Sequence, residues 1–237
     1  ISNKMETYNL LSSSGINVPK YNVINSVEAL KASLAKFKYP QNTVISKPSN
    51  GRGGRGLYVF LGKDKPPSWL GSGKRETRIT LDSFSFKTLI DVVHGECLVM
   101  PMLSSPAYDV DLMAIKGDVK AIVVRERINP SGIPFQGNKI LQNKTIEKYC
   151  KEIAKILNLD GLHDIDLMTD DEGNACIIEV NPRPSGSMAA SLIAGVPIID
   201  IAILSLLKQK IPTVNIKDDI TVLPGNDNIM RIVHEKN

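Results

Sequence analysis

Carboxylate and amide oxygens recur at alternate positions in two short stretches, residues 164–168 (Asp-Ile-Asp-Leu-Met) and residues 178–183 (Ile-Glu-Val-Asn-Pro-Arg). Alternate residues of a β-strand share one face, so each stretch would present its polar side chains together. If the two strands pair, Asp164 and Asp166 would share a face with Glu179 and Asn181, so that two carboxylates and an amide oxygen converge. Hard oxygen ligands of this kind suit Mg²⁺ or Mn²⁺. This polar face is a predicted metal site, and a solvated polar face is the alternative.

The two stretches are expected to pair as a hairpin around the acidic turn at residues 170–173. Strict alternation places the apolar side chains of the second strand on the opposite face from the metal ligands. We therefore expect Cys176, Ile178 and Val180 to point into a core.

Arg183 follows the second strand directly and lies between Pro182 and Pro184. The fixed φ angles of the two prolines would hold it rigidly. A guanidinium at this point could stabilise a phosphoryl group during transfer. The alternative role is an ordinary ion pair with a nearby carboxylate.

A glycine-rich stretch at residues 51–56 contains the pattern G-x-G-x-x-G. A dinucleotide-binding loop would continue as a helix, but residues 57–60 favour a strand, and a Walker loop would carry lysine where Leu57 stands. The remaining phosphate-binding interpretation is a hairpin tip whose backbone N–H groups can approach phosphates, with Lys47 upstream. A flexible surface hairpin is the alternative. The predicted phosphate-binding glycines are Gly51, Gly53, Gly54 and Gly56.

The rest of the pattern predicts helices and strands that would position these groups. Asn3 is expected to cap the first helix and Asp82 the third. The expected helices cover residues 3–14, 26–37, 82–93, 145–157, 187–194 and 198–208. The expected strands cover residues 20–24, 44–48, 57–60, 97–100, 108–115, 119–125, 164–169, 175–180 and 229–233, with irregular segments at 62–78 and 129–141.

The composition excludes several classes of protein. The chain has 237 residues, 42% of them hydrophobic, which allows one large domain or two small subdomains. A net charge of +4 with few aromatic residues argues against nucleic acid as a partner. Three cysteines without a Cys-x-x-Cys pair argue against disulfides or zinc. No apolar run has the roughly 18 residues of a membrane span, so we expect a soluble, cytoplasmic protein without a membrane partner.

With these motifs in this order, nearly the whole chain resembles the ATP-grasp superfamily. It is most similar to the branch that includes the carbamoyl-phosphate synthase large subunit, biotin carboxylase and amino-acid ligases. The resemblance implies an α+β fold of two subdomains that bind a nucleotide between their sheets. Residues 1–97 would carry the phosphate-binding strand and the glycine-rich flap. Residues 98–237 would carry the metal site and the catalytic arginine.

The resemblance also implies individual roles. Lys4, Lys47 and the glycine loop would hold the phosphates of ATP. The backbone of a hinge that includes Met100, Met102 and Leu103 would read the adenine. Asp166, Glu179 and Asn181 would bind one or two magnesium ions, since the thirteen-residue step from the first to the second fits the family. Arg183 and Lys47 would act as catalytic residues.

Two positions depart from the family's pattern. Met100 stands where family members commonly have a glutamate, and Ala107 stands where many have an acid that contacts ribose, a role that Asp109 or Asp111 could take. The domain that usually precedes this module is not part of the sequence. We therefore expect a preceding domain or a homodimer to complete the acceptor site.

The function implied by the resemblance is that of a Mg·ATP-dependent ligase. It would activate a small-molecule carboxylate as an acyl phosphate for attack by an amine or ammonia. Arg125 and Arg127 on one strand face, together with Ser185, could bind that carboxylate; surface charge and a helix cap are their alternative roles. Two other functions remain open, carbamoyl-phosphate-synthase-like phosphorylation of bicarbonate or carbamate, and non-catalytic nucleotide binding.

Overall fold

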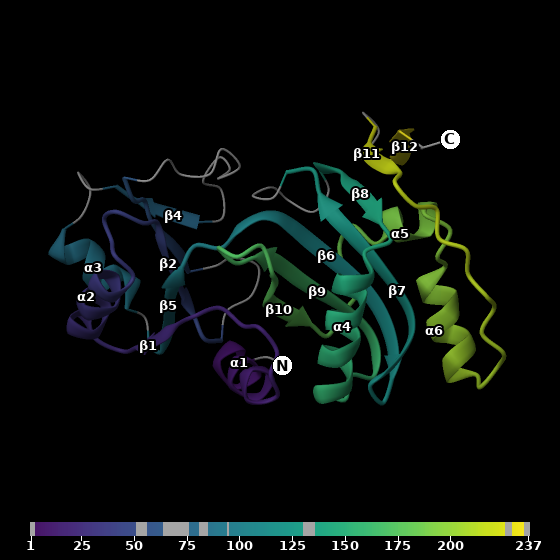
Figure 1. Cartoon of the computed structure of the whole chain (residues 1–237), viewed down its shortest axis with the longest axis horizontal. Helices are drawn as coiled ribbons and strands as arrows, with labels where there is room; N and C mark the ends of the chain where they lie inside the picture. The colour runs from purple at the N-terminus through teal and green to yellow at the C-terminus, as the bar shows by residue number, and fades with distance from the viewer. Residues whose placement is uncertain are drawn as a thin grey trace. The chain divides into compact units, whose positions relative to one another are not determined.

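The computed structural model describes residues 3–50, 56–63, 76–80, 85–93, 95–129, 136–225 and 229–234. The chain divides into two compact units (Figure 1). The amino-terminal unit comprises residues 2–9 and 19–104, and the carboxy-terminal unit comprises residues 10–18 and 105–237. The first change of unit falls within α1 (Lys4–Ser13). The second lies near the subdomain boundary expected after residue 97, which stays a prediction.

Among the described residues, the amino-terminal unit has a sheet with the strand order β1-β5-β2-β3-β4. Its only parallel pair among the pairings of this sheet in the described part of the chain is β3 with β4. The prediction that residues 62–78 are irregular is wrong for the last of them, because they belong to β4. The strands are β1 (Asn22–Ile24), β2 (Val44–Pro48), β3 (Leu57–Phe60), β4 (Glu76–Ile79) and β5 (Cys97–Pro101).

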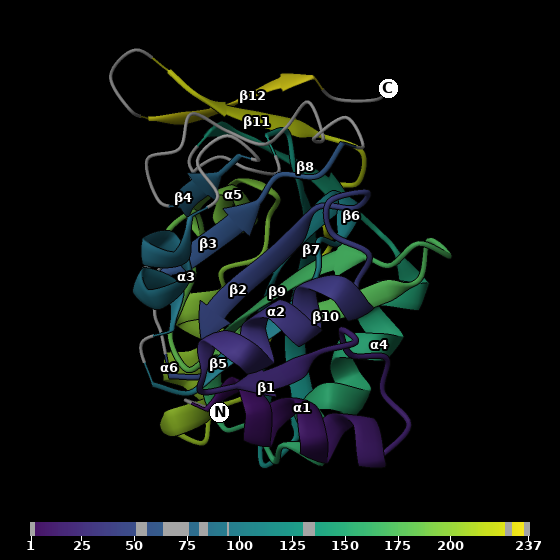
Figure 2. The same cartoon turned by 90° about the vertical axis from the view of Figure 1, so that its left-hand side faces the viewer.

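Two helices, α2 (Val27–Lys36) and α3 (Phe86–Val92), pack on this sheet, and Figure 2 shows α2 lying across it. Ser26 caps α2 by accepting a hydrogen bond from the backbone N–H of Ala29 at 3.1 Å. The expected cap of α3 was Asp82, which lies outside the described residues. Ser85 caps α3 instead. The helices bury Leu30, Leu34, Leu89 and Val92 against Ile24, Val44, Phe60 and Val99 of the sheet.

The carboxy-terminal unit contains, in its described residues, a sheet with the strand order β10-β9-β6-β7-β8-β11-β12. The turn between β6 and β7 comprises Lys116 and Gly117, one residue earlier than expected. The short strands β8 and β11 were not predicted. The strands are β6 (Ser104–Ile115), β7 (Asp118–Arg127), β8 (Asn138–Leu141), β9 (Gly161–Thr169), β10 (Ala175–Asn181), β11 (Thr221–Pro224) and β12 (Met230–His234).

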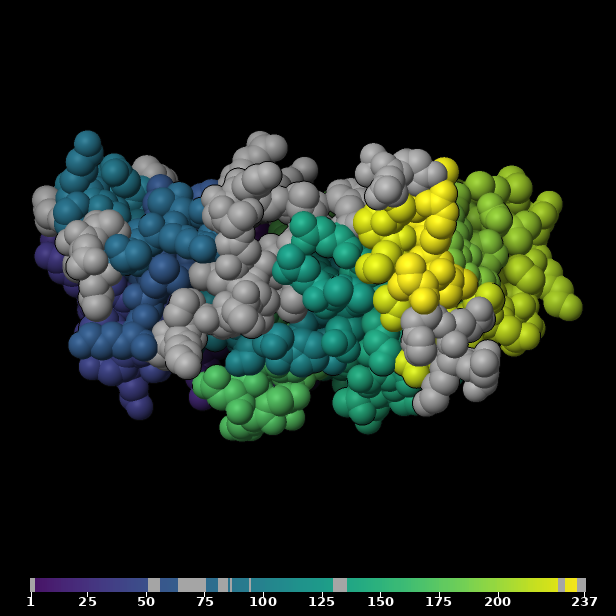
Figure 3. Space-filling view, turned by 90° about the horizontal axis from the view of Figure 1, so that it is seen from above, coloured from purple at the N-terminus to yellow at the C-terminus, as the bar shows by residue number. Residues whose placement is uncertain are grey.

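Besides the end of α1, the described residues of this unit form the helices α4 (Lys144–Ile156), α5 (Ala189–Ile193) and α6 (Ile198–Leu206). Ile146, Cys150 and Ile153 form the buried stripe of α4, as the sequence predicts. Figure 1 shows α4 lying along the sheet, and Figure 3 shows β11 and β12 in yellow beside the yellow-green segment that contains α6. No helix in the described ranges is long and apolar enough to cross a membrane.

The turn between β6 and β7 needs glycine for two separate reasons. Gly117 has a φ angle of +81°, which disfavours side chains, and an added Cβ would lie 3.0 Å from the backbone Cα of Lys155. Gly173 has the same φ angle, but a Cβ there would meet nothing within 4 Å. Substitution of the two glycines therefore allows the cost of backbone strain to be measured separately from the cost of a clash with α4.

We predict that Gly173→Ala lowers the free energy of unfolding by about 1 kcal/mol, the cost of left-handed backbone. Gly117→Ala should cost about 1–3 kcal/mol more, because the backbone of α4 must move. Urea denaturation of both variants measures the difference. Equal losses would mean that α4 does not pack against this turn as described.

Candidate functional site

The hairpin of β9 and β10 has one extra residue on its second strand. Ile177 pairs with Leu167, but the next pair is Glu179 with Asp166, so the register shifts at Ile178. An extra unpaired residue of this kind is a β-bulge, which changes the direction of the side chains that follow it.

The bulge decides which side chains of β10 face the core. Ile177 pairs with Leu167 and Val180 pairs with Ile165, so both lie on the apolar face, at 0% and 3% exposure. The expectation that Ile178 points into the core is wrong, because the bulge leaves it half-buried and Ile177 takes its place. Val180 is buried on the core face as expected. Cys176 is also buried, but it pairs with Met168 and so lies on the opposite face from Ile177.

Beyond the bulge, the predicted metal ligands lie on one face of the hairpin. Glu179 is opposite Asp166, and Asn181 is opposite Asp164. The side-chain amide of Asn181 also donates to Oδ2 of Asp166 at 3.3 Å. The structure thus brings the three predicted ligands together, and it adds Asp164 beside them.

Further carboxylates come from β6, which is next to β9 in the sheet. Single oxygens of Asp109, Asp164 and Asp166 all lie within 4.8 Å of one another. Asp109 and Asp111 are 0% and 1% exposed, so neither is placed in solvent to contact a ribose, the role considered from the sequence. Asp109 and Asp111 are two residues apart on their strand, as Arg125 and Arg127 are on theirs. This spacing of opposite charges is a signal that could have predicted the cluster.

Arg127 connects the cluster to the predicted metal site. Its Nε donates to both oxygens of Asp109, at 3.0 and 2.9 Å, and its Nη2 donates to Oδ1 of Asp166 at 2.8 Å. The side chain of Arg127 is 19% exposed. Arg127 therefore touches a predicted metal ligand and keeps contact with solvent.

Arg125 differs from the substrate-binding residue that we expected. Its side chain is fully buried, with Nε 3.0 Å from Oδ2 of Asp111. Its Nη1 donates to Asn138 Oδ1 at 3.1 Å and to Ser187 Oγ at 2.6 Å. The hydroxyl of Ser191 donates to Oδ2 of Asp111 at 2.6 Å. A guanidinium held in this way is structural, so we do not retain Arg125 as a substrate ligand.

The carboxylates of the cluster differ in acidity because their partners differ. Burial alone would raise the pKa of Asp109, but the hydrogen bonds and charge of Arg127 outweigh it and lower this pKa to about 2. For Asp164, burial and the charges of Asp109 and Asp111 raise the pKa to about 7. Burial and the charge of Asp164 also raise the pKa of Asp166. Ionising all the carboxylates of this face would therefore give it more negative charge than its arginines compensate.

A cation would suit this face of the hairpin. Oδ1 of Asp164 is buried without a hydrogen-bond partner among the described residues, an unfavourable state for a carboxylate oxygen. Asp166, Glu179 and Asn181 supply only hard oxygens as ligand atoms, which Mg²⁺ and Mn²⁺ prefer. The donor set of the hairpin thus fits a magnesium or manganese ion.

Arg183 lies next to the same face. Its Nη1 donates to the carbonyl oxygen of Pro184 at 2.8 Å and lies 3.5 Å from Oδ2 of Asp164, while 58% of the side chain is exposed. Ser185 is buried, and its Oγ accepts from the backbone N–H of Ser187 at 3.2 Å. Arg183 is accessible to a ligand. Ser185 stabilises a local turn, and the helix-capping role that was its alternative is wrong, because the N-cap of α5 is Met188 without a side-chain hydrogen bond.

The predicted phosphate-binding lysines belong to the amino-terminal unit. Lys47 is 9% exposed, and its Nζ donates to the hydroxyl of Tyr8 at 2.9 Å. The backbone N–H of Lys4 donates to the carbonyl oxygen of Ser49 at 3.0 Å, which places α1 beside the end of β2. Of the predicted loop, Gly51, Gly53 and Gly54 lie outside the described residues.

The structure shows the neighbours of Gly56, the described glycine of that loop, and of the predicted hinge residues. Gly56 has a φ angle of +73°, and an added Cβ would lie 2.9 Å from the ring of Pro48. Met100 is buried within β5, and the backbone N–H of Met102 donates to the carbonyl oxygen of Thr43 at 3.1 Å. Leu103 follows, half-buried. Adenine recognition by Met100, Met102 and Leu103 stays a prediction.

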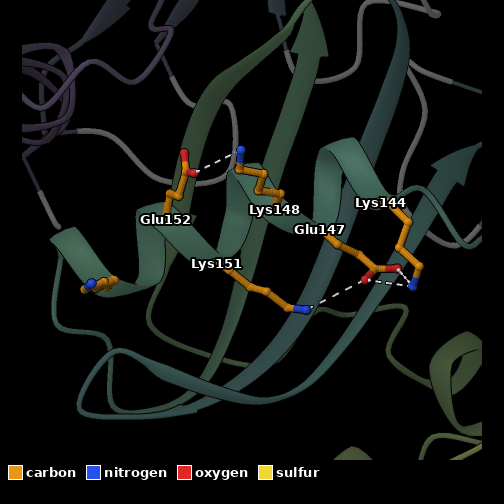
Figure 4. Close-up of a pocket in the computed structure, with 6 residues that line it drawn as sticks. Lys144, Glu147, Lys148, Lys151 and Glu152 are labelled. Carbon is orange, nitrogen blue, oxygen red and sulfur yellow. Dashed lines mark hydrogen bonds and ion pairs between the residues drawn. The ribbon is translucent and has the colours of Figure 1, made fainter.

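A concavity on the outer side of α4, with a volume of about 380 Å³, is a weaker candidate (Figure 4). Lys144 pairs with Glu147 at 3.1 Å, and Lys148 lies 3.9 Å from Glu152. The side chains of these two lysines are 76% and 80% exposed. Pairs three or four residues apart on an exposed helix are typical of a solvated face.

The buried pair of Arg125 and Asp111 leads to a testable prediction about the stability of the fold. Arg125→Met leaves Asp111 buried without its cation, so we predict a loss of about 3–5 kcal/mol in the free energy of unfolding. Asp111→Leu combined with Arg125→Met should recover much of that loss, because no charge is then buried alone. Urea denaturation of both variants measures this, and a loss below about 1 kcal/mol in the single variant would contradict the assignment.

The chain is similar to known proteins along most of its length. A family model described as "ATP-grasp in the biosynthetic pathway with Ter operon" matches residues 94–227, more than half of the chain. The arginine-specific large chain of carbamoyl phosphate synthase from Geobacillus stearothermophilus is 27% identical over 190 residues, 80% of this chain. The carbamoyl phosphate synthase large chain from Clostridium acetobutylicum is 28% identical over 201 residues, 79% of this chain. The chain spans 17% of the length of each of these two relatives.

Solved structures show the same fold. An N5-carboxyaminoimidazole ribonucleotide synthetase in its ADP complex has a TM-score of 0.70 at 17% identity, covering 94% of this chain and 56% of that one. Biotin carboxylase from Campylobacter jejuni, in a complex with ATP, has a TM-score of 0.68 at 16% identity, covering 94% of this chain and 50% of that one. These likenesses confirm the predicted α+β fold, and with the family match they lead to one conclusion: the chain belongs to the ATP-grasp family.

Proposed function

We propose that this chain is the nucleotide-binding and catalytic module of a Mg·ATP-dependent ligase that activates a carboxylate as an acyl phosphate. The observation that carries the proposal is the polar face of the β9–β10 hairpin, where Asp166, Glu179 and Asn181 supply hard oxygens. Beside them is the buried Oδ1 of Asp164, for which the described part of the chain provides no hydrogen-bond partner. Family members are ATP-dependent carboxylate ligases, which supports the same class of chemistry here.

The reaction would proceed in two steps. A carboxylate oxygen of the substrate attacks the γ-phosphorus of ATP, the bond to the bridging oxygen breaks, and ADP leaves. An amine or ammonia then attacks the acyl carbon, inorganic phosphate leaves with the bonding electrons, and the nitrogen loses a proton. A magnesium ion bound by Asp166, Glu179 and Asn181 would neutralise phosphate oxygens during the first step.

The cationic side chains would complete this stabilisation. Arg183 is exposed and only loosely held by Asp164 at 3.5 Å, so its guanidinium can turn toward a phosphoryl group as negative charge develops. Lys47 and Lys4 would bind phosphate oxygens of the nucleotide. Of the two arginines on β7, Arg127 is the one that we retain for the substrate carboxylate, because part of its side chain reaches solvent.

A second candidate is phosphorylation of bicarbonate or carbamate. The specific observation in its favour is that the two relatives described above are carbamoyl phosphate synthase large chains. Release of ADP with bicarbonate and ammonia, but with none of a panel of organic carboxylates, would favour this candidate over the first. Release of ADP with an organic carboxylate and an amine would favour the ligase.

The metal site is testable by thermal melts with a slowly hydrolysed ATP analogue. At a hundredfold excess over its dissociation constant, the analogue should stabilise the wild-type chain by about 2.7 kcal/mol in magnesium. We predict that EDTA removes most of this gain, and that Glu179→Gln removes it even in magnesium. The matched control is Glu152→Gln on the exposed side of α4, which should behave as wild type. An unchanged gain in Glu179→Gln would exclude Glu179 as a metal ligand.

A variant at Arg183 shows whether this residue acts in catalysis or in nucleotide binding. Arg183→Ala should lower substrate-dependent ADP formation by about 100- to 1,000-fold, the usual cost of removing one donor to a developing negative charge. Binding of the ATP analogue should change little, since the side chain is exposed. Arg231→Ala on β12 serves as the control. Full ADP formation by Arg183→Ala would contradict the catalytic role of Arg183. Its ion pair with Asp164 would then be its only remaining role.

A further inference from the structure

The β-bulge at Ile178 is the feature that gives the hairpin its polar face. In a regular register, Glu179 and Asn181 would share a face with Ile177, which is fully buried against the core. The one extra residue turns both ligands to the side of Asp164 and Asp166. Any group that holds the bulge in place therefore controls where the metal ligands point.

One side chain outside the hairpin binds the backbone beside the bulge. The backbone N–H of Ile177 donates to the hydroxyl oxygen of Tyr149 at 3.1 Å. Tyr149 belongs to α4, so this hydrogen bond ties the second strand of the hairpin to a helix. A bulge interrupts the ladder of the sheet, and a side-chain acceptor can satisfy the N–H group beside it.

The hydroxyl of Tyr149 is itself fixed. It donates to the backbone carbonyl oxygen of Asn17 in the same unit, so its proton and an acceptor lone pair are both used. Burial raises the pKa of Tyr149, which keeps the hydroxyl protonated and able to donate. The orientation of the oxygen toward Ile177 is thus set by a second hydrogen bond.

Asn17 connects this arrangement to the rest of the hairpin. Its side-chain amide donates to Oδ2 of Asp170 in the turn at 2.8 Å and to the carbonyl oxygen of Ala175 at 3.1 Å. The second strand is therefore held at Ala175 through Asn17 and at Ile177 through Tyr149. Both contacts precede the bulge, and Glu179 follows it.

We propose that Tyr149 is a positioning residue for the metal ligands Glu179 and Asn181, acting through the backbone of Ile177 and the bulge at Ile178. The inference rests on the proposed function, because it concerns the ligands of the same metal site. The hydrogen bonds of Tyr149 in the described part of the chain go to the backbone of Asn17 and of Ile177. Its effect is on the register of the strand that carries them.

The test compares Tyr149→Phe with the wild-type chain. Mn²⁺ binding, followed by electron paramagnetic resonance with and without the ATP analogue, should weaken by about 10- to 100-fold, the usual effect of losing a group that orients metal ligands. The amide of Ile177 should exchange with solvent about tenfold faster or more. Metal affinity within twofold of wild type in the folded variant would overturn the proposal.

Thr169→Val is the matched control. It removes a hydroxyl that donates to the carbonyl oxygen of Ser105 at 2.9 Å from the same hairpin, away from the bulge. Mn²⁺ affinity should stay within twofold of wild type. An equal loss in Thr169→Val and Tyr149→Phe would mean that general loosening of the hairpin, and not the bulge, weakens the site, which also overturns the proposal.

A further test uses the wild-type chain, so its outcome does not depend on whether a variant folds. If the bulge and the metal site are coupled, Mg²⁺ must slow exchange of the Ile177 amide, because such coupling is reciprocal. Unchanged exchange at saturating Mg²⁺ would contradict the role of Tyr149. Failure of the wild-type chain to bind Mn²⁺ at all would remove the metal site and the proposed function, whereas binding that ignores Tyr149→Phe removes only this inference.

Discussion

The concentration of negative charge inside the carboxy-terminal unit is the constraint on which the rest of the site depends. Asp109, Asp111 and Asp164 are almost fully buried, and Asp166 lies beside them. Arg125 and Arg127 pair with the carboxylates of β6, whereas burial and the charges of Asp109 and Asp111 make ionisation of Asp164 on β9 unfavourable and raise its pKa to about 7. A structure that only had to fold would gain by replacing such groups with apolar ones. Their presence is explained if a cation completes the site during function.

The hairpin shows how a single residue can create that site. With Ile177 on the core face, regular alternation would have placed Glu179 and Asn181 on that face too, and the bulge at Ile178 places them on the charged face instead. The ion pair of Arg127 with Asp166, the hydroxyl of Tyr149 and the proposed metal thus all act on the same hairpin. A local irregularity of the backbone thus positions the groups that the proposed chemistry of an ATP-grasp ligase requires.

Much of the fold could be predicted from the sequence, because long periodic segments such as the helix with Cys150 and the β9–β10 hairpin carry their own signals. The short strands β4, β8 and β11 were missed since their pairing depends on distant partners. Residue type and alternation indicated the polar face, and the resemblance to the ATP-grasp superfamily selected Asp166, Glu179 and Asn181 as its metal ligands. The bulge could not be predicted, because alternation counts residues and gives no sign of an extra one, and the buried state of Arg125 required knowledge of the facing strand.

The central claim is that Asp166, Glu179 and Asn181 hold a divalent cation. The most direct test is a crystal of the chain grown with Mn²⁺ and the ATP analogue, with anomalous scattering used to locate the metal. The account predicts an anomalous peak within coordination distance of oxygen atoms from these three side chains, about 2.0–2.2 Å as for a small hard cation. An analogue bound with its metal elsewhere, or with no metal beside the hairpin, would contradict it.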